Sequence, residues 1–243
     1  MKLLIPGGAG YIGSHLVKYA QEHGHEVVVL DDFSTGHEWA VKDCEILRVN
    51  LLDQDKLSQV LKGRYFDGVI HFAAKSLVGE SVKKPDLYYR NNVVGTLNLV
   101  SEMLNNEINN LVFSSTAAIF GNPLTDKITE DHPKNPINPY GQSKLEAELG
   151  LRQIAADTGM EVVIIRPPLV YGPGVKANFA ALMRVVQRGW PLPLGAVHNQ
   201  RSFIALDNLV NFIVTCIDHP QAANHTFLVS DGQDLSTTNL VRG

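Results

Sequence analysis

The sequence predicts a doubly wound α/β fold, in which a parallel β-sheet carries helices on both faces. Three observations support this fold class. Short apolar runs alternate with amphipathic stretches through the first two-thirds of the 243 residues. A glycine-rich turn follows the first apolar run at once, and a pair of acids ends the second. Strand and helix in strict alternation are typical of a parallel sheet with crossover helices.

The strands are predicted from apolar runs that are short and have no polar side, as buried parallel strands do. They are Leu3–Pro6, Glu26–Leu30, Glu45–Val49, Gly68–His71, Asn110–Ser115 and Glu161–Arg166. Amphipathic stretches between them predict helices over Tyr11–His23, Asp53–Lys62, Pro85–Asn106 and Tyr140–Thr158. These elements define a first domain over residues 1–167.

The pattern changes after Arg166, where proline and glycine break the chain into loops and short elements. We expect a smaller substrate-binding lobe over residues 168–243. Its predicted helices are Val175–Gly189 and Asp207–His219, and its predicted strands are Ser202–Ile204 and His225–Val229. A further helix starts at Thr237, six residues before the last residue, so we expect this lobe to be incomplete.

Composition excludes several function classes. With 21 basic and 25 acidic residues and no charged run, the chain has no feature typical of nucleic-acid or membrane binding. No apolar run approaches the ~20 residues of a membrane-spanning helix, and no signal peptide is visible, so a cytoplasmic location is expected. Cys44, Cys216 and the histidines lack the spacing of metal ligands, and no metal site is expected.

The glycine-rich turn predicts a dinucleotide site. Gly7, Gly10 and Gly13 have the spacing G-x-x-G-x-x-G between the first strand and the first helix. Glycines there let backbone N–H groups approach a pyrophosphate at the helix N-terminus. Asp31 and Asp32 follow about twenty residues later, where a carboxylate accepts hydrogen bonds from the adenosine ribose and repels a 2′-phosphate. The predicted cofactor is therefore NAD.

A tyrosine and a lysine predict acid–base chemistry. Tyr140 and Lys144 are four residues apart, on one face of a predicted helix. A free phenol has a pKa of ~10, and a neighbouring ammonium group lowers it toward neutrality. Ser114 and Thr116 lie at the carboxyl end of the preceding strand, where open α/β sheets bind their ligands.

Together these motifs resemble the extended short-chain dehydrogenase/reductases and, within them, the nucleotide-sugar epimerases and dehydratases. Residues 1 to about 150 are similar to the UDP-glucose 4-epimerases. The matching segments are Gly7–His15, His71–Ala74, Val78–Val82, Pro85–Thr96, Phe113–Ala117 and Pro139–Lys144. From about Val162 the similarity shifts toward the UDP-N-acetylhexosamine epimerases and 4-keto-sugar reductases of polysaccharide synthesis, through Arg166–Phe179, Pro191–Gly195 and Arg201–Ile204.

The resemblance implies roles for individual residues. Tyr140 becomes the acid–base residue, Lys144 its partner and Thr116 the hydroxyl that binds the substrate oxygen. Asn178 is expected near the phosphates of a UDP-sugar, and Arg201 near its UDP moiety. The residues expected to contact NAD are Gly7, Gly10, Tyr11, Ile12, Gly13, Asp31, Asp32, Phe72, Ala73, Ala74, Asn92, Ser114, Tyr140, Lys144 and Pro167.

The apolar stripe Val93, Leu97, Val100 and Leu104 is interpreted as core, and part of the same helix is expected to pack against a second copy in a homodimer.

Two classes of function stay open at this point. The first is an enzyme that acts at C4 of a UDP-sugar, either an NAD-dependent 4-epimerase or the related 4-keto-sugar reductase or dehydrogenase. In the epimerase, Tyr140 removes the 4-hydroxyl proton while hydride moves to NAD, and hydride returns to the other face of the sugar. The second class is a truncated or chimeric chain that binds NAD without turnover.

Overall fold

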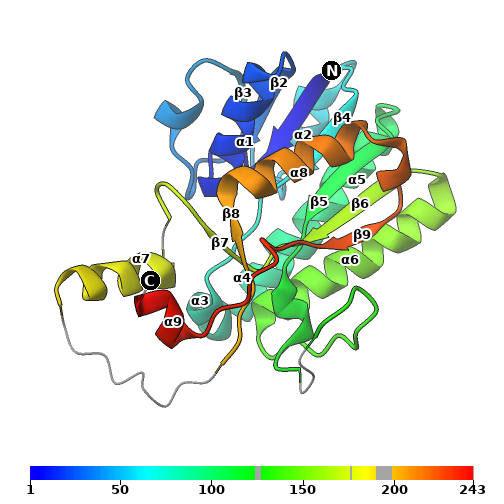
Figure 1. Cartoon of the computed structure of the whole chain (residues 1–243). Coiled ribbons are helices and arrows are strands. Elements are labelled where there is room, and N and C mark those ends of the chain that lie inside the picture. The colour runs from blue at the N-terminus through cyan, green and yellow to red at the C-terminus, as the bar shows by residue number, and fades with distance from the viewer. Residues whose placement is uncertain (124–126, 176, 190–198, 243) are drawn as a thin grey trace.

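The computed structural model describes residues 1–123, 127–175, 177–189 and 199–242, without the side chains of 177, 178 and 242. In the described residues a seven-stranded sheet has the order β3-β2-β1-β4-β5-β6-β9, with every neighbouring pair parallel. The sequence order reverses between β1 and β4, which is the switch point where doubly wound sheets bind ligands. Because β1, β4 and β5 are parallel, the loops that follow them leave the same end of the sheet (Figure 1).

The elements of the sheet follow the apolar runs closely. The strands are β1 (Lys2–Pro6), β2 (Glu26–Asp31), β3 (Glu45–Arg48), β4 (Gly68–His71), β5 (Asn110–Ser114), β6 (Glu161–Arg166) and β9 (Thr226–Leu228). The helices around them are α1 (Tyr11–Glu22), α2 (Gln54–Leu61), α3 (Val78–Lys83), α4 (Pro85–Tyr89), α5 (Gly95–Asn105), α6 (Pro139–Thr158) and α8 (Leu206–Asp218). The predicted α/β fold class is confirmed.

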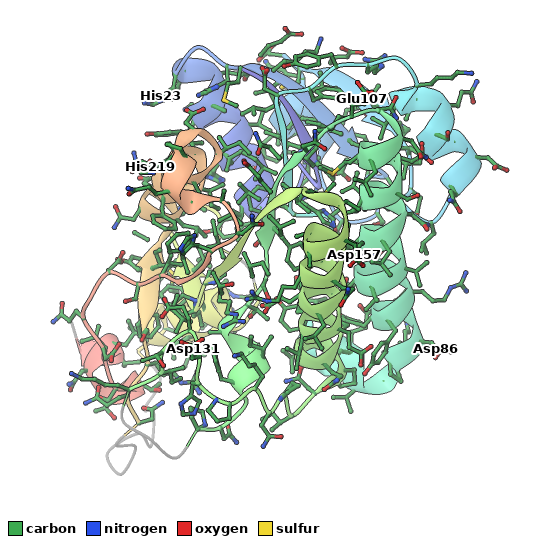
Figure 2. All side chains as sticks on the ribbon, turned by 90° about the vertical axis from the view of Figure 1, so that its right-hand side faces the viewer. His23, Asp86, Glu107, Asp131, Asp157 and His219 are labelled. Atoms are coloured by element: carbon green, nitrogen blue, oxygen red, sulfur yellow. The ribbon has the colours of Figure 1, made fainter. Side chains whose placement is uncertain are left out.

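Alternate side chains along each strand enter two separate cores. Leu3 and Ile5 of β1 pack with α1 and α8, whereas Leu4 of the same strand packs with α2, α5 and α6. Figure 2 shows α5 and α6 lying side by side on one face of the sheet. Asp86 of α4 and Glu107, which follows α5, are labelled near the two ends of the α4–α5 segment. Burial on both faces explains why the strands have no polar side.

The helix predicted over Pro85–Asn106 is continuous but not regular. Residues 90–94, between α4 and α5, form a π-helical stretch, in which backbone hydrogen bonds join residues five positions apart. Such stretches widen one turn of a helix and re-aim its side chains. Asn91 and Asn92 both lie in this turn. The period of the sequence predicts the helix but not this local irregularity.

The chain after residue 168 takes part in the main sheet as well as extending beyond it. β9 pairs with β6, and α8 packs on α1. β7 (Leu169–Tyr171) and β8 (Phe203–Ala205) form a separate two-stranded parallel sheet. α7 (Ala177–Gln187) and α9 (Thr237–Arg242) extend away from the main layers (Figure 1).

β7 was not predicted, because the prolines and glycines on either side of its three residues favour a loop. Among the described residues, no helix has both the length and the apolar character needed to cross a bilayer.

Candidate active site

The glycine turn after β1 is shaped by close packing against the end of β4. Gly7 has a φ of +79°, a conformation that L side chains rarely adopt. A Cβ on Gly7 would lie 2.4 Å from the backbone nitrogen of Ala73, and one on Gly13 would lie 2.3 Å from the carbonyl oxygen of Gly7. Gly10 precedes α1, and no side chain caps the start of that helix. Residues 10–13 at this helix start line the cavity described below, where uncapped N–H groups can bind a pyrophosphate.

Two acids at the end of β2 hold the loops around this turn. The Asp31 carboxylate accepts hydrogen bonds from the backbone nitrogens of Ala9 (3.0 Å) and Phe33 (2.8 Å). Burial raises the pKa of Asp31, and these two hydrogen bonds oppose the rise. Asp32 accepts from the backbone nitrogen of Ser34 (2.8 Å) and from the Asn50 amide (2.7 Å).

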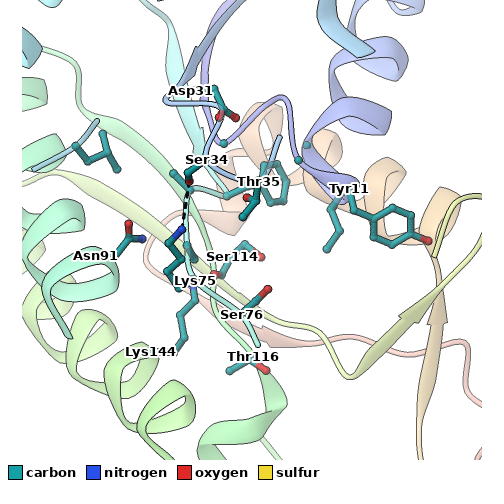
Figure 3. A pocket seen from close by; sticks show the side chains of 18 of the residues that line it. Tyr11, Asp31, Ser34, Thr35, Lys75, Ser76, Asn91, Ser114, Thr116 and Lys144 are labelled. Atoms are coloured by element: carbon teal, nitrogen blue, oxygen red, sulfur yellow. Dashed lines mark hydrogen bonds between the residues drawn. The ribbon is translucent and has the colours of Figure 1, made fainter. Parts of the chain in front are cut away.

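A cavity of about 300 Å³ extends from this turn to the carboxyl end of β5. Figure 3 shows its wall, with Asp31 at one end and Thr116 with Lys144 at the other. The structure brings together the following predicted residues in its lining: Gly7, Gly10, Tyr11, Ile12, Gly13, Asp31, Asp32, Phe72, Ala73, Ala74, Ser114, Thr116, Tyr140, Lys144 and Pro167.

Further lining residues were not among the predicted site residues: Leu30, Ser34, Thr35, Val49, Asn50, Leu51, Lys75, Ser76, Asn91, Ser115, Pro168 and Val170. All but Asn91 lie at the end of a predicted strand or within five residues after it, so their position at the carboxyl end of β2, β3, β4, β5 or β6 was the available signal. Asn91 is different, because it reaches the cavity from the π-helical turn, which no sequence pattern indicated.

Lys75, which follows β4, reaches the loop after β2. Its ammonium group donates a hydrogen bond to the Ser34 hydroxyl at 3.2 Å, the contact drawn in Figure 3. Asn92 fixes the backbone of Lys75 from behind, since its amide accepts from the Lys75 nitrogen (2.8 Å) and donates to the Lys75 oxygen (3.0 Å). Asn92 is 1% exposed and does not line the cavity, so it supports the wall from the interior.

Tyr140 and Thr116 meet at the other end of the cavity. Thr116 hydrogen-bonds to the Tyr140 side chain, which lowers the pKa of Tyr140, while burial raises it by more. The edge of the Tyr88 ring packs against Tyr140, with centroids 6.5 Å apart and an angle of 81° between the planes. The start of α6 is fixed by Asn138, whose side chain accepts from the Gly141 nitrogen at 2.9 Å.

Lys144 lies one helical turn from Tyr140, with only 3% of its surface exposed. Its ammonium group donates to the Ser114 carbonyl oxygen at 2.7 Å and lies 4.5 Å from the centre of the Phe113 ring. Burial lowers the pKa of Lys144 to about 7, and the negative charge of Glu148 opposes this shift. The Lys144 ammonium group therefore releases its proton far more readily than that of an ordinary lysine.

His71 lies behind this pair and is a structural group. Thr96 donates its hydroxyl proton to the Asn92 carbonyl oxygen (2.7 Å), so it accepts from His71 Nε2 (2.9 Å). Burial lowers the pKa of His71 to about 3, with a smaller contribution from the charge of Lys144. His71 is therefore neutral at physiological pH.

Arg201, one of the predicted substrate residues, does not line the cavity. Arg201 is exposed, and its backbone pairs with Leu235 in an isolated antiparallel bridge. Asn178 belongs to α7, and its side chain is outside the described part of the chain. Within the described residues, no group of three or more His, Cys, Asp or Glu side chains is arranged to hold a metal ion.

The fold and these motifs match one family model. The model described as "NAD dependent epimerase/dehydratase family" matches residues 3–230. The chain belongs to this family. Its membership confirms the predicted fold class and NAD as the predicted cofactor, and the cradle at Gly7 with Asp31 beside it fits a dinucleotide.

Relatives and solved structures agree with this family. A UDP-glucose 4-epimerase from Vibrio cholerae is 40% identical over 247 residues, which cover 99% of this chain and 74% of that protein. A UDP-glucose 4-epimerase structure from Thermotoga maritima, with UDP-glucose, has a TM-score of 0.91 at 27% identity. That match covers 100% of this chain and 81% of the Thermotoga maritima chain. A UDP-glucose 4-epimerase structure from Brucella ovis, in complex with NAD, has a TM-score of 0.89 at 32% identity. That match covers 99% of this chain and 81% of the other.

Proposed function

We propose that this chain is an NAD-dependent UDP-sugar 4-epimerase that interconverts UDP-glucose and UDP-galactose. One observation supports the proposal most strongly. The hydrogen-bonded hydroxyls of Thr116 and Tyr140 occupy one end of a cavity whose other end is the glycine cradle beside Asp31. The Vibrio cholerae relative, matched over nearly the whole chain, is named for this reaction.

The residues have separate tasks in this reaction. NAD, when bound, accepts hydride from C4 of the sugar and returns it. Gly7, Gly10 and Gly13 leave space for its pyrophosphate, and Asp31 accepts hydrogen bonds from its adenosine ribose. A dinucleotide held by these residues would extend along the cavity, whose other end carries Tyr140.

Tyr140 moves the proton of the sugar 4-hydroxyl. Thr116 binds the same oxygen and orients it toward the phenol. The positive charge of Lys144 favours the phenolate form of Tyr140, which burial alone would suppress. Lys144 is buried beside Phe113 and Tyr140 is half-buried, so water reaches the two groups only from the cavity that they line.

The proposal extends to the substrate lobe and the assembly. We assign cofactor binding to residues 1–167 and sugar-nucleotide binding to residues 168–243, with Asn178 and Arg201 on the phosphates and the uridine side. We extend the proposal to N-acetylhexosamine forms of the substrate, because the chain from about Val162 onward resembles enzymes that act on them.

We also propose a cytoplasmic homodimer that pairs through α5 and its neighbours. Val94 next to α5 and Leu149 of α6 are 45% and 58% exposed there, although both are apolar.

Product analysis tests the proposed reaction. The chain is incubated with NAD and, separately, with UDP-glucose, UDP-galactose and their N-acetyl forms, with and without added NADH or NADPH. Epimerisation gives the C4 epimer without net consumption of reduced cofactor. A product that forms only with stoichiometric NADH or NADPH would identify a 4-keto-sugar reductase instead. Binding of NAD with no product from any sugar would contradict both enzymes.

A further inference from the structure

A buried ion pair lies directly behind the wall that carries Thr116. Glu148 of α6 and Arg166 at the end of β6 each have only 1% of their side chain exposed. Arg166 Nε donates to Glu148 Oε1 at 3.0 Å, and Arg166 Nη2 donates to Glu148 Oε2 at 2.7 Å. Two parallel hydrogen bonds fix both the distance and the orientation of the two planar groups.

Ser115 connects this pair to the cavity. Its hydroxyl donates to Glu148 Oε1 at 2.5 Å, and its backbone nitrogen donates to the Ile165 carbonyl oxygen at 2.8 Å. Ser115 lines the cavity and immediately precedes Thr116. The carboxylate of Glu148 thereby holds the turn after β5 against the helix that carries Tyr140.

Arg166 extends the same network away from the cavity. Its Nη1 donates to the Glu130 carbonyl oxygen at 2.7 Å, and its guanidinium lies 5.3 Å from the centre of the Phe120 ring. The Glu130 carboxylate in turn accepts from the Leu228 nitrogen of β9 at 3.0 Å. Arg166 therefore connects β6 and the segment after β5 to the last strand of the sheet.

Glu148 also acts on Lys144, which precedes it by one helical turn. The groups that face Lys144 come from four elements. They are His71 of β4, Phe113 and Ser114 of β5, Tyr140 and Glu148 of α6, and Arg166 of β6 beyond Glu148. His71 is neutral, so Glu148 is the negative group among them. Burial opposes a positive charge on Lys144, and Glu148 favours it.

A purely structural role explains such a pair poorly. Removing two charges from water has a large desolvation cost, and well-packed apolar side chains at the same places are often as stable or more stable. The charged pair accepts a hydrogen bond from Ser115 and places the negative charge of Glu148 near Lys144. Apolar side chains could do neither.

We propose that Glu148 and Arg166 form a positioning pair for the reaction. The Glu148 carboxylate holds Ser115, and with it Thr116, in register with Tyr140, and it stabilises the positive charge of Lys144. Arg166 fixes the Glu148 carboxylate in the orientation that binds Ser115 and keeps its charge near Lys144. The inference rests on the proposed function for its catalytic consequence, whereas the effect on Lys144 is measurable without turnover.

The test compares Glu148→Gln with Glu146→Gln, a matched change on the same helix, where Glu146 accepts a hydrogen bond from Gln142 at 3.0 Å. The ionisation of Lys144 is followed by NMR of ¹³C-labelled lysine, with the signal assigned by its loss in Lys144→Met. In Glu148→Gln we expect the pKa of Lys144 to fall by at least about half a unit. We also expect kcat for epimerisation to fall by about 10- to 100-fold, with its alkaline limb moved to lower pH. Glu146→Gln is expected to match the unchanged protein in both measurements.

The double variant Glu148→Gln/Arg166→Met provides a second test, because it leaves no unpaired buried charge and should fold where the single variant does not. It is expected to bind NAD within about threefold of the unchanged protein but to keep the lowered pKa of Lys144 and the lowered kcat. An unchanged Lys144 titration in every Glu148 variant that folds, or full recovery of kcat in the double variant, would overturn the positioning role. A shifted Lys144 titration in a chain that epimerises no UDP-sugar would support the electrostatic part and contradict the proposed function alone.

Discussion

The ammonium group of Lys144 donates a hydrogen bond to the main-chain carbonyl oxygen of Ser114 at 2.7 Å. This bond joins α6 to the carboxyl end of β5 at the place where Tyr140 and Thr116 meet. The main chain of β5 therefore fixes the lysine at one helical turn from Tyr140. Because the bond uses the backbone of Ser114, it does not depend on the side chain at that position.

Replacing Tyr140 by phenylalanine removes only the phenolic oxygen. We expect kcat to fall by ~10²–10⁴-fold, as is typical when a general acid–base group is removed. NAD affinity should stay within about threefold, because the ring still packs against Tyr88. Steady-state kinetics with UDP-galactose and calorimetry with NAD measure the two effects. Turnover close to that of the unchanged protein would show that another group moves the proton.

The depressed pKa of Lys144 predicts how stability depends on pH. The folded state releases this proton near pH 7, whereas the unfolded chain holds it up to the ordinary value of 10.5. Between these values the unfolded state binds more protons, so the free energy of unfolding rises with pH. The unfolding free energy of the unchanged protein minus that of Lys144→Met should therefore increase from pH 6 to pH 9. The increase should be at most about 1.4 kcal/mol per pH unit.

Urea denaturation at several pH values measures this difference. Lys18→Met is the control, since Lys18 is on the surface of α1 with 76% of its side chain exposed. It should show no such pH dependence. A flat difference for Lys144→Met as well would mean that Lys144 keeps its ordinary ionisation in the folded state.

The close contact at Gly7 predicts a large effect from one methyl group. Gly7→Ala places a Cβ against the backbone of Ala73, whereas Gly24 has nearly the same φ, +81°, and no atom within 4 Å of the added Cβ. Gly24→Ala should cost about 1 kcal/mol of stability and leave NAD binding intact. Gly7→Ala should cost clearly more and weaken NAD binding at least tenfold. Equal NAD affinities in the two variants would contradict the cradle at Gly7.

Asp31 should control the choice of cofactor. The unchanged protein should bind NAD more tightly than NADP, because the carboxylate repels a 2′-phosphate. Asp31→Asn should weaken NAD binding and bring the two affinities closer together. The ratio of the two dissociation constants is the measurement, since it cancels any general loss of folding. An unchanged protein that prefers NADP would contradict the assignment.

The sequence predicts the sheet well because its strands are buried on both faces. β4 and β6 have the predicted bounds, and the glycine turn with Asp31 lies where its spacing indicates. Most of the residues predicted to contact NAD line one cavity, because parallel strands have their carboxyl ends at the same end of the sheet.

Other features depend on contacts between distant segments. Asn91 enters the cavity through a π-helical turn, which the apolar period of its helix does not reveal. The pairing of β9 with β6 and the bond between Ser115 and Glu148 join residues 62 and 33 positions apart. No local pattern specifies either contact. The roles of all the predicted site residues stay predictions, those of Asn92, Asn178 and Arg201 among them.

In the proposed reaction, hydride leaves C4 of the sugar and returns to the same carbon while Tyr140 exchanges the proton. UDP-galactose that carries deuterium at C4 tests this claim most directly. After incubation with the chain and NAD, the proposal predicts UDP-glucose with the deuterium still at C4, and almost no product with Tyr140→Phe. UDP-glucose without deuterium, or no UDP-glucose from a chain shown to bind NAD, would contradict it.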